Sequence, residues 1–340
     1  MGRTYKFYTQ QSLHKFLNNF LDLSRRQSTE TLDLRASDLT SLPTKVGKLT
    51  NLQVLNLQDT QIQDLPPEII QLGKLRELNL QGTLLYKFPM ELLSLSNLQS
   101  LDLSYTGIKE IPPEIANLTQ LKSLRLRSTK IDTLPAEISQ LTHLEYLGLS
   151  GTSFNLLPPE VFTLPRLQSL DLSHTKLVAV QKSIASLANL KKLSLAATDI
   201  TQLPVEIAQL QNLEEIDLSA SHITFLPAEM GQMQNLKKLN LSLTHFDSIP
   251  QEIKDLPSLK IIKEDLTVIV DGEQRSEWLV LYESGAAESR MKRTGKNLAP
   301  QGVDIPLDVY VESEGLREIE KIRYATALFF TELGFKIEQI

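Results

Sequence analysis

The 340-residue sequence contains no cysteine, so it cannot form a disulfide, bind a metal ion through thiolates or use a thiol as a nucleophile. Long apolar runs are missing too. No stretch approaches the roughly 18 continuous apolar residues of a membrane-spanning helix. Residues 1–10 lack the apolar core of a secretory signal peptide. These absences predict a cytoplasmic protein without a membrane partner; a cysteine-free secreted protein is the alternative.

An excess of positive charge is also absent, since the net charge at pH 7 is −6. Nucleic-acid-binding surfaces depend on clustered Lys and Arg, so the sequence argues against a nucleic-acid partner. The motifs of common enzyme classes are missing as well: there is no phosphate-binding glycine loop, no H-E-x-x-H and no G-x-S-x-G. We therefore predict that the chain is not an enzyme, with no catalytic residues, cofactor or metal.

A 23-residue period is what the sequence does contain. An L-x-L unit begins at Leu32 and recurs every 23 residues, at Leu55, Leu78, Leu101, Leu124, Leu147, Leu170, Leu193, Ile216 and Leu239. Ile262 falls on the next position of the period, after which the pattern stops. Ten repeats of one length predict a solenoid, in which each repeat buries its apolar face against its neighbours.

The second repeat indicates how one unit folds. Leu55 and Leu57 are two residues apart and therefore point to the same face of a short strand. The segment Leu65–Ile69, which reads L-P-P-E-I, begins a helical turn, because proline loses no hydrogen bond at the first helical position. Each repeat thus contains one strand and one helical turn.

This pattern resembles the leucine-rich-repeat family. The L-x-x-L-x-L framework with an L-P-x-E-I second half covers residues 32–261. It is similar to the intracellular class found in Ras-associated scaffolds, plant Ras-group proteins and many bacterial repeat proteins. The resemblance implies an α/β fold, namely a right-handed horseshoe-shaped solenoid with a concave parallel β-sheet. Extracellular members generally close their ends with disulfide-rich caps, which this chain cannot form.

One position departs from the family. Members usually carry Asn after the strand, where its amide links neighbouring turns, whereas this chain carries a hydroxyl in every repeat: Ser37, Thr60, Thr83, Thr106, Thr129, Thr152, Thr175, Thr198, Ser221 and Thr244. We expect these hydroxyls to be buried and to pair with backbone groups of the next turn as a structural ladder. A row of phosphorylation sites is the alternative.

A second departure lies in the seventh repeat, where Val180–Ile184 reads V-Q-K-S-I and lacks both the proline and the glutamate. It is either a tolerated variant or a local change of curvature.

We divide the chain into three segments. Residues 1–31 form an N-terminal helical cap, with an amphipathic helix over 11–23. Residues 32–261 form the ten repeats. Residues 262–340 form a small α+β module, with strands over 266–270, 277–282 and 305–311 and a helix over about 314–333.

The outward positions of the central strands suggest a binding surface. They carry Tyr105, Arg125, Arg127, Tyr146 and His174, followed by smaller residues in later repeats. Tyr and Arg are enriched at binding hot spots because they bury much area while keeping polar groups. These five residues are our candidate partner-binding site, and an ordinary solvated sheet face is the alternative. His222 and His245 fall on adjacent repeats, but no third metal ligand accompanies them.

The function that these features favour is that of a monomeric protein-interaction scaffold or sensor, which binds a protein partner on the concave face. One alternative is a multidomain effector whose C-terminal module, residues 262–340, carries a signalling or catalytic activity that the repeats target. Another is an extended structural or assembly protein.

Overall fold

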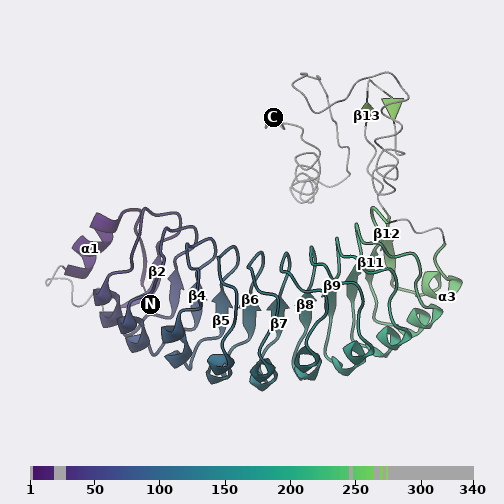
Figure 1. Cartoon of the computed structure of the whole chain (residues 1–340), viewed down its shortest axis with the longest axis horizontal. Helices are drawn as coiled ribbons and strands as arrows, with labels where there is room; N and C mark the ends of the chain where they lie inside the picture. The colour runs from purple at the N-terminus through teal and green to yellow at the C-terminus, as the bar shows by residue number, and fades with distance from the viewer. Residues whose placement is uncertain (1–2, 19–27, 245–247, 264–268, 271–272, 275–340) are drawn as a thin grey trace. The chain divides into compact units, whose positions relative to one another are not determined.

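The computed structural model describes residues 3–18, 28–244, 248–263, 269–270 and 273–274. The chain divides into two units, Met1–Lys263 and Glu264–Ile340. Figure 1 shows the first unit as an arc in which strands form one layer and short helices line the outer side. In the second unit, β13 (Ile269–Val270) and β14 (Glu273–Gln274) form an antiparallel pair; the predicted elements in residues 275–340 lie outside the described residues.

The first unit contains an open sheet of twelve parallel strands, arranged in chain order from β1 to β12. The strands are β1 Arg3–Lys6, β2 Thr29–Asp33, β3 Val54–Asn56, β4 Glu77–Asn79, β5 Ser100–Asp102, β6 Ser123–Arg125, β7 Tyr146–Gly148, β8 Ser169–Asp171, β9 Lys192–Ser194, β10 Glu215–Asp217, β11 Lys238–Asn240 and β12 Lys260–Ile262.

The helical layer consists mostly of five-residue 3-10 helices. They are η2 Thr44–Lys48, η3 Pro67–Gln71, η4 Met90–Ser94, η5 Pro113–Asn117, η6 Ala136–Gln140, η7 Pro159–Thr163, η8 Lys182–Ser186, η9 Val205–Gln209 and η10 Ala228–Gln232. Among the described residues of the unit, two α-helices lie near its ends, α1 Gln10–Asn18 and α3 Gln251–Lys254. The proline before most 3-10 helices has an extended backbone. It also disfavours a helical conformation at the residue before it, so the helix begins only after the proline.

The core lies between the sheet and the helical layer. Leu32 pairs with Leu55, and Leu55 pairs with Leu78, so the strand register repeats every 23 residues. The apolar residues of the repeat, such as Leu55, Ile62 and Ile69, are fully buried. Burial of one such side chain stabilises the fold by about 1.5–3 kcal/mol. The predicted leucine-rich solenoid with a parallel sheet is confirmed.

The N-terminal end differs from the helical segment that the sequence predicts. β1 adds a parallel strand to the edge of the sheet, before α1 begins. Tyr5 and Phe7 point to the same side of this extended segment and pack against Phe16 of α1, with ring centroids 4.9 and 5.0 Å apart. The alternation of Tyr5 and Phe7 was the signal for this strand. The predicted helix extended to residue 23, but residues 19–27 lie outside the described part of the chain.

The C-terminal end departs from the period by one residue. Leu239 pairs with Ile261 rather than with Ile262, the residue that the period predicts. Leu241 N donates to the carbonyl of Ile262, and Lys260 N donates to that of Lys237. All three residue pairs between β11 and β12 are 22 positions apart, so the register is already shifted where β12 begins.

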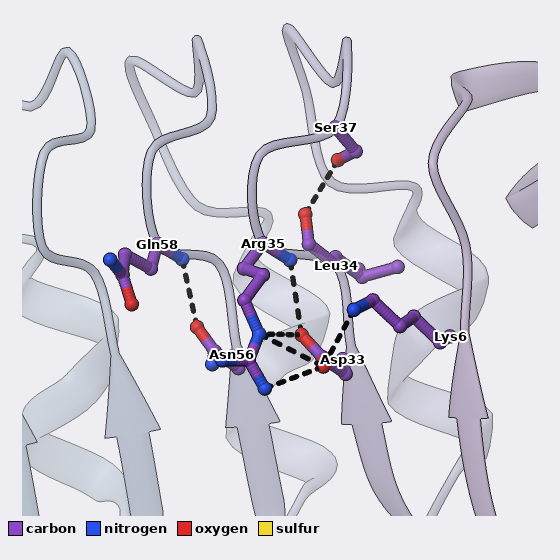
Figure 2. A network of polar contacts seen from close by, with 7 residues as sticks. All are labelled: Lys6, Asp33, Leu34, Arg35, Ser37, Asn56 and Gln58. Atoms are coloured by element: carbon purple, nitrogen blue, oxygen red, sulfur yellow. Dashed lines mark hydrogen bonds and ion pairs between the residues drawn. The ribbon is translucent and has the colours of Figure 1, made fainter.

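The hydroxyl row is buried, but its hydrogen bonds differ from the expectation. Each hydroxyl donates to the carbonyl oxygen three residues earlier in its own turn, at 2.5–2.8 Å, whereas the sequence predicts a bond to the next turn. Figure 2 shows this bond between Ser37 and Leu34. The reason is local: the chain turns sharply after the second core leucine, so its carbonyl lies nearest to the hydroxyl.

Side-chain links between turns come from a different position, just before the first leucine of the L-x-x-L-x-L framework. Asn97, Asn189, Asn212 and Asn235 each donate from the side-chain amide to the carbonyl 24 residues earlier, at 2.7–2.8 Å. These amides connect adjacent turns, as the post-strand Asn does in the family. The recurring N-L-x-x-L pattern was the sequence signal for them.

The seventh repeat keeps the architecture despite losing proline and glutamate. Its helix η8 has the same length as the other 3-10 helices, and Gln181 takes the extended conformation of the missing proline. Gln181 Nε2 donates to the carbonyl of Leu157 at 2.7 Å, and Lys182 Nζ lies 3.3 Å from Glu206 Oε1 of the next repeat. These contacts favour the interpretation as a tolerated variant.

We predict that Thr129→Val lowers the free energy of unfolding by about 1 kcal/mol, because valine keeps the shape but loses the hydroxyl bond to Leu126. Urea denaturation measures the change. Thr201→Val makes the same atomic change at an exposed threonine and serves as the control, with an effect within about 0.5 kcal/mol. A Thr129→Val protein as stable as wild type would show that the hydroxyl bond contributes nothing.

Candidate binding surface on the concave face

The residue between the two core leucines of each strand points away from the core, because side chains alternate along a strand. In seven repeats this residue is Asp or Asn, and its Oδ1 accepts the backbone N–H two residues later at 2.9–3.2 Å. We call this bond the Asx cap; it is made by Asp33, Asn56, Asn79, Asp102, Asp171, Asp217 and Asn240. The cap satisfies a backbone donor where the chain leaves the strand.

The first repeat contains the fullest version of this cap (Figure 2). Asp33 accepts the backbone N–H of Arg35 at 3.2 Å, and its two carboxylate oxygens also accept Nε and Nη2 of Arg35 at 2.9–3.0 Å. Lys6 Nζ lies 3.9 Å away. Burial alone would raise the pKa of Asp33, but the hydrogen bonds and charge of Arg35, together with Lys6, hold it below its usual value. Asp33 is therefore ionised at neutral pH.

The central repeats bring the predicted aromatic and cationic residues together. Arg125 lies over the Tyr146 ring, with its guanidinium carbon 4.7 Å from the ring centroid, and Arg127 lies over the Tyr105 ring at 5.6 Å. Arg125 Nη1 also donates to Ser123 Oγ at 2.7 Å. We call Tyr105, Arg125, Arg127, Tyr146 and His174 the central cluster. Stacking holds each guanidinium in place and limits the entropy that it loses on binding a ligand.

Gly148 makes room for this arrangement. A Cβ atom at Gly148 would lie 2.9 Å from two atoms of the Tyr146 side chain, which is too close for a real contact. Any other residue there would push the Tyr146 ring away. Gly148 replaces the Asx residue of its repeat, so the chain loses a cap where the tyrosine lies.

Two cluster residues have an unusual backbone conformation. Tyr105 and His174 have φ values of 58° and 56°, in the left-handed region. The same position is left-handed in every repeat, at Ala36, Asp59, Gly82, Tyr105, Ser128, Gly151, His174, Ala197, Ala220 and Leu243. Only two of these ten are glycine, although a left-handed backbone costs other residues roughly 1–2 kcal/mol. The sequence analysis missed this constraint because the residues share no chemical type.

The pKa values of Tyr146 and His174 are shifted in opposite directions. Burial raises the pKa of Tyr146, and the Asp171 charge raises it further, against the opposing effect of Arg125. Burial lowers the pKa of His174, and the charge of Arg127 lowers it further, while Asp171 and Asp217 act in the opposite direction. Both side chains are therefore uncharged at neutral pH, and the arginines supply the positive charge of the cluster.

Small polar residues separate Arg127 from His174. Ser173 Oγ donates to Asp171 Oδ1 at 2.7 Å and lies 2.9 Å from Ser150 Oγ. Ser150 is only 1% exposed. The sequence analysis did not identify this serine pair, although two serines 23 residues apart at an outward position were a signal for it.

In the part of the chain that the structure describes, the His, Asp and Glu side chains form no group of three that could hold a metal ion. His222 Nδ1 lies 3.6 Å from Asp199 Oδ1, and His245 lies outside the described residues. Within those same residues, no helix has the length and apolar character needed to cross a bilayer.

We predict that the pKa of His174 lies below that of an ordinary histidine and that Arg127→Ala moves it upward, because the change removes a neighbouring positive charge. A proton NMR titration of the histidine rings measures both values, with His174→Gln identifying the resonance. The shift is expected to be only partial, since burial is the larger cause. An unchanged or lower pKa in Arg127→Ala would contradict the described geometry.

Comparisons with known proteins place this geometry in context. Profiles described as "Leucine-rich repeat region" match residues 74–145, 114–180 and 179–276, and a "Leucine rich repeat" profile matches residues 27–85. No curated protein matches the sequence significantly.

Among solved structures, a leucine-rich-repeat protein of Leptospira interrogans is 33% identical, with a TM-score of 0.67 over 78% of this chain and 70% of that one. The ectodomain of the Arabidopsis thaliana membrane receptor kinase GASSHO1/SCHENGEN3, solved in complex with CASPARIAN STRIP INTEGRITY FACTOR 2, is 26% identical. Its TM-score is 0.60, over 71% of this chain and 33% of that one.

The plant peptide hormone receptor RGFR1, solved in complex with RGF2, is 28% identical, with a TM-score of 0.60 over 71% of this chain and 40% of that one. The chain thus spans less than half the length of either plant receptor. The repeat period, the parallel sheet and the family profiles agree, and the chain belongs to the leucine-rich-repeat family.

Proposed function

We propose that the repeats act as a scaffold or sensor that binds a protein partner across the concave face, centred on the central cluster. The observation that carries this proposal is the pair of stacked arginines, Arg125 on Tyr146 and Arg127 on Tyr105. Tyr105 is 43% exposed, so a large aromatic surface stays accessible beside two positive charges. Aromatic residues and arginine dominate the energetics of protein interfaces.

The surroundings of the cluster support a ligand that approaches closely. Ser128, Gly151 and Ser173 are small residues at neighbouring outward positions. Two structurally similar plant receptors were solved as complexes with CASPARIAN STRIP INTEGRITY FACTOR 2 and RGF2. By analogy we propose a protein or peptide segment as the ligand of this chain. We propose further that the chain works as a cytoplasmic monomer and without catalysis of its own.

We predict that alanine at Tyr105, Arg125, Arg127 and Tyr146 weakens peptide binding by about tenfold or more, because truncated hot-spot residues cost over about 1 kcal/mol each. Selection from a random peptide library against the full chain supplies the ligands, and fluorescence polarisation measures their affinities. Circular dichroism checks that the quadruple variant remains folded.

A matched control exists outside the concave face. Lys87 lies over the Tyr86 ring at 5.4 Å, and Tyr86 is 53% exposed, so this pair has the same chemistry on the connection between β4 and η4. Alanine at Tyr86 and Lys87 is expected to leave binding unchanged. Equal affinity of the selected peptides for wild type and the quadruple variant would refute the proposed function, as would a selection that enriches no ligand.

A further inference from the structure

The row of Asx caps is interrupted in three repeats. The eighth carries Ser194 at the capping position, and the fifth and sixth, at the central cluster, carry Arg125 and Gly148 between Asp102 and Asp171. Asp102 accepts the backbone N–H of Ser104 at 2.9 Å, and Asp171 accepts that of Ser173 at 3.0 Å. In the fifth and sixth repeats the equivalent backbone groups belong to Arg127 and Ser150. Neither N–H donates a hydrogen bond to any described residue of the chain.

The two uncapped groups differ in exposure. Ser150 is 1% exposed, so surrounding atoms cover it. Arg127 is an exposed residue. Arg125, which stands at the capping position, turns its guanidinium to the Tyr146 ring and to Ser123 instead. A partner can therefore approach Arg127 from the concave side.

The guanidinium of Arg127 also has no ion-pair partner among the described residues. It makes no hydrogen bond to them either, and it stacks on the Tyr105 ring. The nearby carboxylates of Asp102 and Asp171 already accept bonds from their own turns. A stacked guanidinium with free donors is prepared for a planar anion.

The first repeat shows what such an arginine binds. Arg35 occupies the same position in its repeat as Arg127, and the residue two before it is Asp33 instead of Arg125. The Asp33 carboxylate accepts the backbone N–H, Nε and Nη2 of Arg35 together (Figure 2). Repeat five presents the same set of donors on Arg127 without the carboxylate. An external carboxylate at the same place would complete the arrangement.

We propose that Arg127 binds the side-chain carboxylate of an Asp or Glu in an extended segment of the protein partner, which takes the place of the missing Asx cap. This inference rests on the proposed function and specifies the chemistry of the ligand. Arg125 adds a second positive charge next to the bound carboxylate, and the Tyr105 ring holds the guanidinium in position.

The test uses the full chain and the peptides selected from the random library. We expect the selected sequences to share an acidic residue, and its change from Glu to Gln, or from Asp to Asn, to weaken binding to wild type by about tenfold. The same peptide change should have little effect on Arg127→Ala, because the two groups interact directly and their losses do not add. Arg35→Ala removes the same charge at the same position of another repeat, where Asp33 already pairs it, and should leave peptide affinity unchanged.

A second variant tests the missing cap itself. Arg125→Asp recreates the Asp33–Arg35 pattern within repeat five and should fill the site internally. We expect it to lose about tenfold more affinity than Arg125→Ala, which leaves the site open, while its denaturation midpoint is no lower than that of Arg125→Ala. Weaker binding with an unchanged denaturation midpoint would show that the introduced aspartate fills the site within a folded protein, whereas a lower midpoint would indicate misfolding and count against the missing cap.

The outcomes distinguish the inference from the proposed function. Peptides that require the central cluster but carry no acidic residue, or whose acidic residue shows no coupling to Arg127, would overturn the carboxylate site and leave the proposed function standing. Competition by inorganic phosphate that exceeds the effect of a carboxylate peptide would also overturn it. Peptides that bind the quadruple alanine variant as well as wild type would overturn both.

Discussion

Residues 23 positions apart lie opposite each other on neighbouring strands, and this register constrains everything else in the repeats. Leucines meet leucines of the next turn only while every repeat keeps the same length, as the pairing of Leu55 with Leu78 shows. An insertion of one residue would move the following leucines to the opposite face of their strand. Packing in the core thus fixes the number of residues per repeat, and with it the position of each outward side chain.

The outward positions are not all equally free to vary. The hydroxyl row bonds its own turn, the Asn row connects adjacent turns, and the Asx caps satisfy backbone donors at the end of each strand. A departure from one of these rows removes a stabilising contact. In a repeat that binds no ligand, nothing offsets this loss of stability. Arg125 and Gly148 are two such departures in consecutive repeats, and they lie where Arg127 and Tyr146 gather. If the proposed function holds, stability and ligand binding place opposing demands on this point of the sheet.

The sequence was sufficient to predict the solenoid, because the period and the identity of the core residues both follow from burial. It also identified the two arginines and two tyrosines that the structure brings into stacked pairs. It did not predict β1, since a single strand at the edge of a sheet has no repeat to reveal it. The hydroxyl bonds were assigned to the wrong turn because spacing along the chain does not show which carbonyl lies nearest. The left-handed position that holds Tyr105 and His174 was missed because its ten residues share a backbone conformation and no side-chain chemistry.

The repeats share one register, and the fifth lacks a cap that the fourth and the seventh have. Residue-resolved amide hydrogen exchange of the free chain tests both statements at once. The account predicts slow exchange at Leu126 and Ser128, which donate to the next repeat, slow exchange at the capped amides of Ser104 and Ser173, and distinctly faster exchange at Arg127. Protection of the Arg127 amide equal to that of Ser104 and Ser173 would contradict it.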